Sequence, residues 1–204
     1  MPAGRGGSLK FPATAQPVFS SEATQAHPLG TRGEDRFGRA FRYCLAGGTT
    51  LVAGNVIQAA AQVADHQDRT PVAAAIDDKV IDISIGATAV TANDYSGGVA
   101  VIDTTPGLGY SYPIKGHLAA ALSATTFDLN LEPGWTIQVA LTTTSRVSLY
   151  ANPYSRVIQT PVTTLTNVAV GACVYPITNA QYGWLGVHGH FGTLIQGTPG
   201  VGLA

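Results

Sequence analysis

Charged side chains are scarce in this sequence. Asp, Glu, Lys and Arg together make up 11% of the 204 residues, whereas an average soluble domain has roughly 25%. The hydrophobic fraction is 45%, which is near average, so Thr, Ser, Ala and Gly take the place of the missing charges. Proteins that are free at high concentration usually carry more charge for solubility. We interpret this composition as an indication that the protein is a component of an assembly.

A strong net charge is also missing. The formal charge is −1, so the chain has no overall basic field that would attract nucleic acid. The charges are unevenly distributed, because residues 1–42 contain six basic and three acidic residues and the remainder contains five basic and nine acidic ones. This distribution predicts a mildly basic N-terminal segment that could dock on an acidic protein surface. An ordinary solvated tail would have the same composition.

Long apolar runs are absent. None approaches the ~20 residues of a membrane span, and the first ten residues, MPAGRGGSLK, lack the apolar core of a signal peptide. We expect a soluble protein that is made in the cytoplasm and does not bind a membrane.

Cysteine and tryptophan occur only twice each. Cys44 and Cys173 lie in apolar, strand-like surroundings, which favours buried free thiols, although a disulfide stays open. Trp135 and Trp184 each follow a glycine at the start of a predicted strand. For both we expect buried anchors rather than a platform on which a sugar would stack.

The motifs of the common catalytic sites are missing as well. The sequence contains no G-x-S-x-G, no G-x-x-x-x-G-K and no H-E-x-x-H. A carboxylate pair of the glycosidase type would have to come from aspartates that we expect at strand ends or turns, where Asp is common for conformational reasons. These are Asp77, Asp78, Asp82, Asp94, Asp103 and Asp128. We predict a protein that is not an enzyme and needs no cofactor.

Histidine is the remaining candidate for a metal ligand. His188 and His190 alternate on a predicted strand, so both would project to one face, and a metal would need a further converging ligand. We favour a pair of surface or interface histidines. His66, between two aspartates, is a similarly weak candidate, and His117 is expected to make a structural hydrogen bond. No metal site is predicted.

The first 35 residues differ in composition from the rest. Residues 1–33 contain four prolines and five glycines, and such a segment cannot bury enough apolar surface to offset the entropy of its ordering. We predict an extended N-terminal arm over residues 1–35, ordered only where a partner holds it. A disordered leader without a role is the alternative.

From residue 36 to residue 204 the pattern is that of β-strands. Tyr110, Tyr112 and Ile114 alternate strictly, as expected for a half-buried strand. Turn signals recur every ~8–12 residues, which is typical of a β-sandwich or barrel, and no alternation of strands with helices indicates a parallel sheet. We predict an all-β protein whose body over residues 36–204 is an antiparallel sandwich or barrel.

Residues 36–58 join the predicted arm to this body. They contain the densest basic cluster, Arg36, Arg39 and Arg42, and the first convincing strand, over residues 40–45. In that strand Phe41 and Tyr43 alternate onto one face. We expect this face to attach the arm to the core while the arginines point toward a partner.

Four segments resemble the small virion structural proteins of tailed bacteriophages, of the capsid decoration or cement type. They are GRAFRYCLAGGTTLVAGNVIQ (38–58), YSGGVAVIDTTPGLGYSYPIKGH (95–117), LTTTSRVSLYANPYSRVIQTP (141–161) and YGWLGVHGHFGTLI (182–195). The third is similar to a recurrent S-x-V-x-L-x-x-N-P-Y-x-x-V pattern of such phage proteins. Together the segments cover most of the chain beyond residue 36.

The resemblance implies a non-enzymatic protein on the outer capsid surface of a virion, made in the host cytoplasm. Such a protein would bind across neighbouring major capsid protein subunits, stabilise the head, and form a homo-oligomer, either a dimer or a trimer. Residues of the arm and of the basic cluster would then contact the capsid. These are Arg5, Lys10, Phe11, Arg32, Arg36, Arg39 and Arg42.

Two other functions remain open at this stage. The first is a phage head-fibre or host-surface adhesion module that touches glycans with exposed aromatic residues and Thr-rich loops. The second is a β-fold hydrolase whose catalytic residues match no familiar motif.

Overall fold

The strands form where apolar and polar residues alternate, as the sequence predicts. The computed structural model describes residues 16–161 and 166–194, and in these residues it contains eleven β-strands, one turn of 3-10 helix (η1, Ala64–His66) and no α-helix. All pairings between the strands are antiparallel. The prediction of an all-β, antiparallel fold is confirmed.

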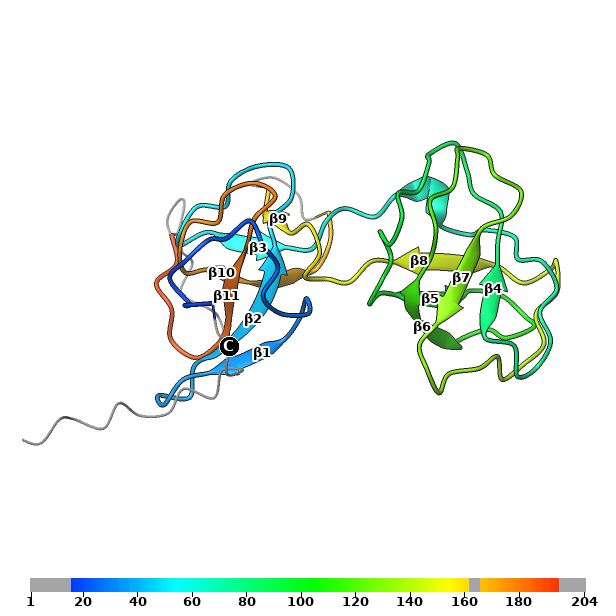
Figure 1. Ribbon diagram of the computed structural model, residues 1–204, viewed down its shortest axis with the longest axis horizontal. Coiled ribbons are helices and arrows are strands. Elements are labelled where there is room, and N and C mark those ends of the chain that lie inside the picture. The colour runs from blue at the N-terminus through cyan, green and yellow to red at the C-terminus, as the bar shows by residue number, and fades with distance from the viewer. Residues whose placement is uncertain (1–15, 162–165, 195–204) are drawn as a thin grey trace, which may run out of the picture. The chain divides into compact units, whose positions relative to one another are not determined.

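The chain folds into two compact units (Figure 1). Residues 1–60 and 153–204 belong to the first, which we call the terminal unit, and residues 61–152 form the second, the inserted unit. Each unit has its own sheet and its own hydrophobic core. The single body expected over residues 36–204 is therefore replaced by two, because strands on both sides of the insertion pair with one another.

The terminal unit contains a six-stranded sheet. In the order of the sheet its strands are β1 (Arg32–Glu34), β2 (Ala40–Leu45), β11 (Tyr182–His188), β10 (Ala169–Cys173), β3 (Val56–Gln58) and β9 (Ile158–Gln159). Residues 154–157, just before β9, bond to the end of β2. The N–H of Leu45 donates to Tyr154 O at 3.0 Å, and the N–H of Val157 donates to Leu45 O at 2.9 Å. Since β9 also pairs with β3, these bonds curl the sheet into a closed barrel.

Strand β2 is buried on both of its faces. Cys44 joins Leu51, Ile57 and Leu185 in one cluster, while Phe41 and Tyr43 pack with Trp184 in another. Phe191 lies against Gly186 of β11, where a Cβ atom would stand 2.6 Å from the ring. A side chain at position 186 would therefore displace this aromatic ring.

The inserted unit contains a five-stranded sheet. In order its strands are β4 (Val80–Asp82), β7 (Asp128–Leu131), β6 (Ser111–Gly116), β5 (Val99–Ile102) and β8 (Val147–Tyr150). The segment 69–72 bonds to both edges of this sheet. Arg69 and Val147 exchange N–H···O bonds of 2.8 and 2.9 Å, and the N–H of Val72 donates to Asp82 O at 2.8 Å. These bonds also close this sheet, so the barrel-like form applies to each unit by itself.

Alternation along the strands fills the core of the inserted unit. Tyr112 and Ile114 of β6 and Leu129 and Leu131 of β7 are buried, and the residues between them are exposed or half-buried. Tyr110, the first residue of the predicted alternation, lies outside β6 and is 42% exposed.

Residues 16–35 do not form an extended arm. Strand β1 pairs with β2, and Gln16 is buried, with its backbone oxygen accepting a hydrogen bond from Trp184 Nε1 at 3.0 Å. The Gln16 side chain accepts a bond from Tyr43 Oη at 2.8 Å and donates one to Tyr182 O at 2.9 Å. These bonds attach the segment to the terminal unit. The rest of the predicted arm, residues 1–15, lies outside the described residues.

Candidate binding surface

The basic cluster predicted from the sequence lies on the β1–β2 hairpin of the terminal unit. The strands pair with Arg32 opposite Arg42 and Glu34 opposite Ala40. The turn between them is closed by two backbone bonds, from Asp35 N–H to Arg39 O (3.0 Å) and from Gly38 N–H to Asp35 O (3.1 Å). Gly38 has φ +77°, a conformation that favours glycine. We call residues 35–39 the hairpin tip.

The Asp35 carboxylate holds the hairpin tip in place. Oδ1 accepts hydrogen bonds from the N–H groups of Phe37 (2.9 Å) and Arg39 (3.0 Å), and Oδ2 accepts one from Arg39 Nε at 2.6 Å. Desolvation raises the pKa of Asp35, but the hydrogen bonds and the charge of Arg39 outweigh it and hold the pKa below its usual range. The turn is therefore stabilised by an ionised carboxylate.

Phe37 and Arg36 project from this rigid turn. The Phe37 side chain is 72% exposed, and the Arg36 guanidinium lies over its ring at 4.6 Å from the centroid. Arg36 has no ion pair with any described residue. The hairpin tip thus presents an aromatic ring and a positive charge together, a combination that is enriched at protein interfaces.

The other predicted arginines make contacts within the terminal unit. Arg32 pairs with Glu34 at 3.4 Å in an exposed position. Arg42 donates a bond of 2.6 Å to Gly30 O and lies over the ring of Tyr154. These contacts assign both side chains a local structural role. Arg5, Lys10 and Phe11, which were also predicted to contact a partner, lie outside the described residues.

Two hollows adjoin the hairpin tip. One, of about 490 Å³, is lined by Arg39, Phe41, Phe191 and the exposed Phe19 and Leu194, among others. The other, of about 390 Å³, is lined by Phe37, Arg39, Gly189 and His190. Both hollows are open at the surface and present aromatic side chains.

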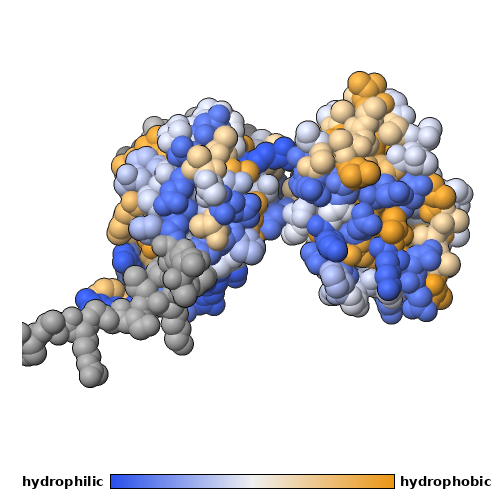
Figure 2. Space-filling view, viewed as in Figure 1, coloured by the Kyte–Doolittle hydropathy of each residue, from blue (hydrophilic) through white to orange (hydrophobic). Residues whose placement is uncertain are grey.

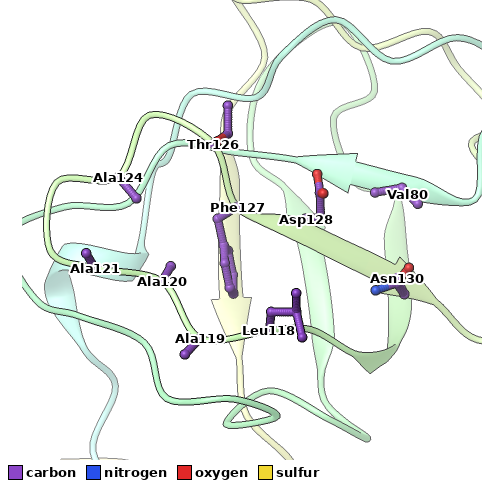
Figure 3. A pocket seen from close by; sticks show the side chains of 10 residues that line it. All are labelled: Val80, Leu118, Ala119, Ala120, Ala121, Ala124, Thr126, Phe127, Asp128 and Asn130. Atoms are coloured by element: carbon purple, nitrogen blue, oxygen red, sulfur yellow. The ribbon is translucent and has the colours of Figure 1, made fainter.

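A separate hollow lies on the inserted unit (Figure 3). It has a volume of about 410 Å³, and Figure 3 shows Phe127 in its middle, between the alanines of residues 119–124 and strands β4 and β7. The lining residues are Val80, Leu118, Ala119, Ala120, Ala121, Ala124, Thr126, Phe127, Asp128 and Asn130. We call this hollow the alanine groove.

The wall of the alanine groove is fixed by backbone bonds. Ala120 and Val90 exchange two N–H···O bonds of 2.9 Å, and the N–H of Ile85 donates to Ala124 O at 2.8 Å. Leu118, at the edge of the groove, is 83% exposed. Asp128 is exposed on the opposite side and forms no ion pair with a described residue.

Exposed hydrophobic side chains are numerous on the inserted unit. Figure 2 shows patches of hydrophobic residues among hydrophilic ones on the visible face of this unit. Over the whole unit the exposed large hydrophobic residues are Val72, Ile76, Val80, Leu108, Tyr110, Leu118, Leu122 and Trp135. Trp135 is 48% exposed, so the prediction that it is buried was wrong, whereas Trp184 is fully buried as predicted.

The two units carry charges of opposite sign. The terminal unit has seven basic and three acidic residues, a formal charge of +4, and the inserted unit has four basic and nine acidic residues, a formal charge of −5. Two of the basic residues, Arg5 and Lys10, lie outside the described residues, and the described part of the terminal unit still carries a formal charge of +2. The charge separation therefore follows the two units.

Two buried histidines of the inserted unit are bound to Tyr95. His66 Nε2 donates to Thr88 O at 2.9 Å, and its Nδ1 forms a hydrogen bond of 2.5 Å with Tyr95 Oη. His117 Nδ1 donates to Leu118 O at 2.8 Å, and its Nε2 accepts from Tyr95 N–H at 3.0 Å. Because a carbonyl only accepts, the ring nitrogen that faces it donates in each histidine, and the Tyr95 N–H fixes Nε2 of His117 as an acceptor. His117 has the structural hydrogen bonds predicted for it.

The other candidate ligands are not gathered into a site. His188 ends β11, and His190 follows Gly189, whose φ is +103°. In residues 16–161 and 166–194 no three His, Cys, Asp or Glu side chains come together in a way that could hold a metal ion. Several aspartates lie at turns or strand ends, as predicted. Asp78 accepts a bond from Ala75 N–H and Asp94 one from Thr91 N–H in turns, while Asp82 ends β4 and Asp128 begins β7.

Both cysteines are buried and free, as the sequence favoured. Burial raises the pKa of the Cys44 thiol far above its usual value, and the nearby Cys173 adds to the effect. Burial also raises the pKa of Cys173, to about 11. Neither thiol is therefore ionised at neutral pH, and neither is a nucleophile in the folded protein.

No protein family, no curated protein and no solved structure matches this chain. The described part of the chain contains no helix of the length and apolar character that a membrane crossing requires.

The alanine groove was not predicted from the sequence. The run Leu118–Ala119–Ala120–Ala121–Leu122 breaks the alternation of the strands around it, and this break was the available signal. A run of small apolar residues cannot fill the space above a neighbouring strand, so a hollow results.

Proposed function

We propose that this chain is a structural virion protein that binds the outer surface of a phage capsid, across neighbouring major capsid protein subunits, and stabilises the head. The observation that carries the proposal is the hairpin tip, where Asp35 holds Phe37 exposed with Arg36 over its ring. A fixed aromatic side chain loses little conformational entropy when a partner buries it.

Two further features support this function. The four segments that resemble decoration proteins are distributed over both units, so the resemblance is not limited to one of them. The low charge and the many exposed apolar side chains suit a protein that spends its functional life against other proteins. With many copies on one head, weak contacts would add up through avidity.

The proposal is tested by sedimenting the purified protein with undecorated heads of the phage that encodes it. Wild-type protein is expected to co-sediment and to raise the temperature at which the heads release DNA. Phe37→Ser and Arg36→Glu are expected to weaken binding at least tenfold, and Val168→Ser, which alters an exposed apolar side chain of the same unit outside the hairpin tip and its hollows, is the matched control. Absence of co-sedimentation by the wild type would refute the proposal.

A second candidate is an adhesion module that binds host glycans. Trp135 and Tyr110 of the inserted unit are 48% and 42% exposed, and exposed aromatic rings are suited to stacking on sugars. This function predicts that the protein alone binds host cells or a glycan array and that Trp135→Ala abolishes the signal. No binding to either would eliminate it.

A further inference from the structure

Each copy of this chain carries two surfaces that complement each other. The terminal unit has a formal charge of +4 and the inserted unit one of −5. Two copies can therefore place the positive unit of one against the negative unit of the other, an attraction that guides encounter and fixes orientation. Each unit has one local feature in which apolar and charged side chains lie next to each other: the hairpin tip on the terminal unit and the alanine groove on the inserted unit.

The projecting feature is the hairpin tip of the terminal unit. Phe37 is 72% exposed, and Arg36 lies over its ring with no ion pair to a described residue. The two backbone bonds of the turn and the three bonds to the Asp35 carboxylate hold this arrangement before any partner arrives.

The receiving feature is the alanine groove of the inserted unit. Its volume is about 410 Å³, its middle is the Phe127 ring, and its alanine wall is held by the bonds between Ala120 and Val90. Asp128 lies at its edge without an ion pair to a described residue. An apolar floor with a carboxylate at the edge matches an aromatic ring accompanied by a guanidinium.

We propose that the hairpin tip of one copy docks in the alanine groove of a second copy. Phe37 packs against Phe127 and the alanines, and Arg36 pairs with Asp128. Because the two surfaces differ, one copy can receive a tip and offer a tip at the same time, either with a single partner in a two-fold pair or with two different copies in a chain or ring. This contact needs no capsid and goes beyond the function proposed above.

The test uses the full-length protein alone, in sedimentation velocity runs over a series of protein and salt concentrations. Wild-type protein is expected to associate at low salt and to dissociate as salt screens the charges. Phe37→Ser and Leu118→Ser are each expected to weaken association about thirtyfold or more, as truncation of an interface hot spot does. Val168→Ser and Leu108→Ser, which alter exposed side chains outside the alanine groove, the hairpin tip and its two hollows, should associate like the wild type.

Mixing the two deficient variants is the decisive step. The Phe37→Ser protein keeps its groove and the Leu118→Ser protein keeps its tip, so the mixture should form a one-to-one complex that grows no further. Association that does not join a tip to a groove would give no such complementation. Charge reversal is a second test. Arg36→Asp and Asp128→Arg should each abolish association when studied alone, and a mixture of the two variants should associate again.

Three outcomes would overturn the proposal. They are a wild type that stays monomeric at low salt up to its solubility limit, association that the tip and groove variants leave unchanged, and a mixture of the deficient variants that stays monomeric. Since no capsid is present, failure here leaves the capsid-binding proposal standing, and failure of capsid binding leaves this one standing.

Discussion

Arg39 Nε lies 2.6 Å from Asp35 Oδ2, and this ion pair closes the turn from which Phe37 projects. The same carboxylate accepts hydrogen bonds from the backbone N–H groups of Phe37 and Arg39. Among the described residues of the terminal unit, the most exposed aromatic ring is thus positioned by a residue two positions away in the sequence. Both proposals above depend on this local arrangement.

Replacement of Asp35 by Ala removes all three of these hydrogen bonds. We expect faster hydrogen exchange at the amides of Phe37 and Arg39 and no change in the inserted unit. Asp78→Ala, which removes a similar turn-closing bond to Ala75 N–H at 2.7 Å in the other unit, is the matched control. Unchanged exchange at the hairpin tip would show that the carboxylate does not order it.

The hairpin tip is expected to respond to acid in a defined direction. The pKa of Asp35 is lowered in the folded protein, so the stabilisation is complete above the unfolded pKa of about 3.9 and is lost as the pH falls through the lower folded value. The Phe37 and Arg39 amide signals in NMR spectra should therefore stay constant from neutral pH to about pH 4 and shift only below it. A midpoint above 3.9, or the same shift in Asp35→Asn, would contradict this assignment.

Two N-terminal truncations should differ sharply. A chain that begins at Gln16 keeps every contact described for the terminal unit, and we expect it to unfold at the same temperature as the full chain. A chain that begins at Glu34 loses Gln16 and most of β1. Tyr43 Oη and Trp184 Nε1 then lose their hydrogen bonds to Gln16. Each such buried group costs about 1–3 kcal/mol.

The loss should be confined to the terminal unit. Trp184 lies in the terminal unit and Trp135 in the inserted unit, so single Trp→Phe versions of each truncated chain let fluorescence follow one unit at a time. Equal stability of the two truncated chains would mean that residues 16–33 contribute nothing to the fold.

Tyr95→Phe tests the buried histidine network. The substitution leaves His66 Nδ1 without its hydrogen bond to the Tyr95 hydroxyl at a buried site, and we expect the inserted unit to lose about 1–3 kcal/mol of unfolding free energy. Tyr110→Phe, at an exposed position of the same unit, should have no effect. Denaturant unfolding followed by Trp135 fluorescence measures both. A neutral result for Tyr95→Phe would show that the bond to His66 is not stabilising.

The thiols should be unreactive in the native protein. Burial and the raised pKa values of Cys44 and Cys173 keep both protonated, and only a thiolate reacts readily. A chromogenic disulfide reagent at pH 8 is expected to titrate neither thiol in the folded chain and both in denaturant. Rapid reaction of one thiol without denaturant would show that its part of the core opens.

The sequence by itself determined the all-β class and the inward residues of several strands. Alternation depends only on the period of two residues along a strand, so Leu129 and Leu131 could be assigned to the core without knowledge of their neighbours. Turn-forming aspartates and the burial of both cysteines follow from equally local preferences. The basic residues of the hairpin tip were also found in this way, because they are close in the sequence.

Tertiary structure alone decided where the units divide and where the surfaces lie. Ile57 pairs with Gln159, a contact across about a hundred residues that no local pattern encodes, and this pairing places residues 61–152 in a unit of their own. Gln16 is ordered because Tyr43, Tyr182 and Trp184 are brought to it from distant strands. Likewise Trp184 is buried and Trp135 exposed, although both follow a glycine, since burial depends on which strands pack against a side chain.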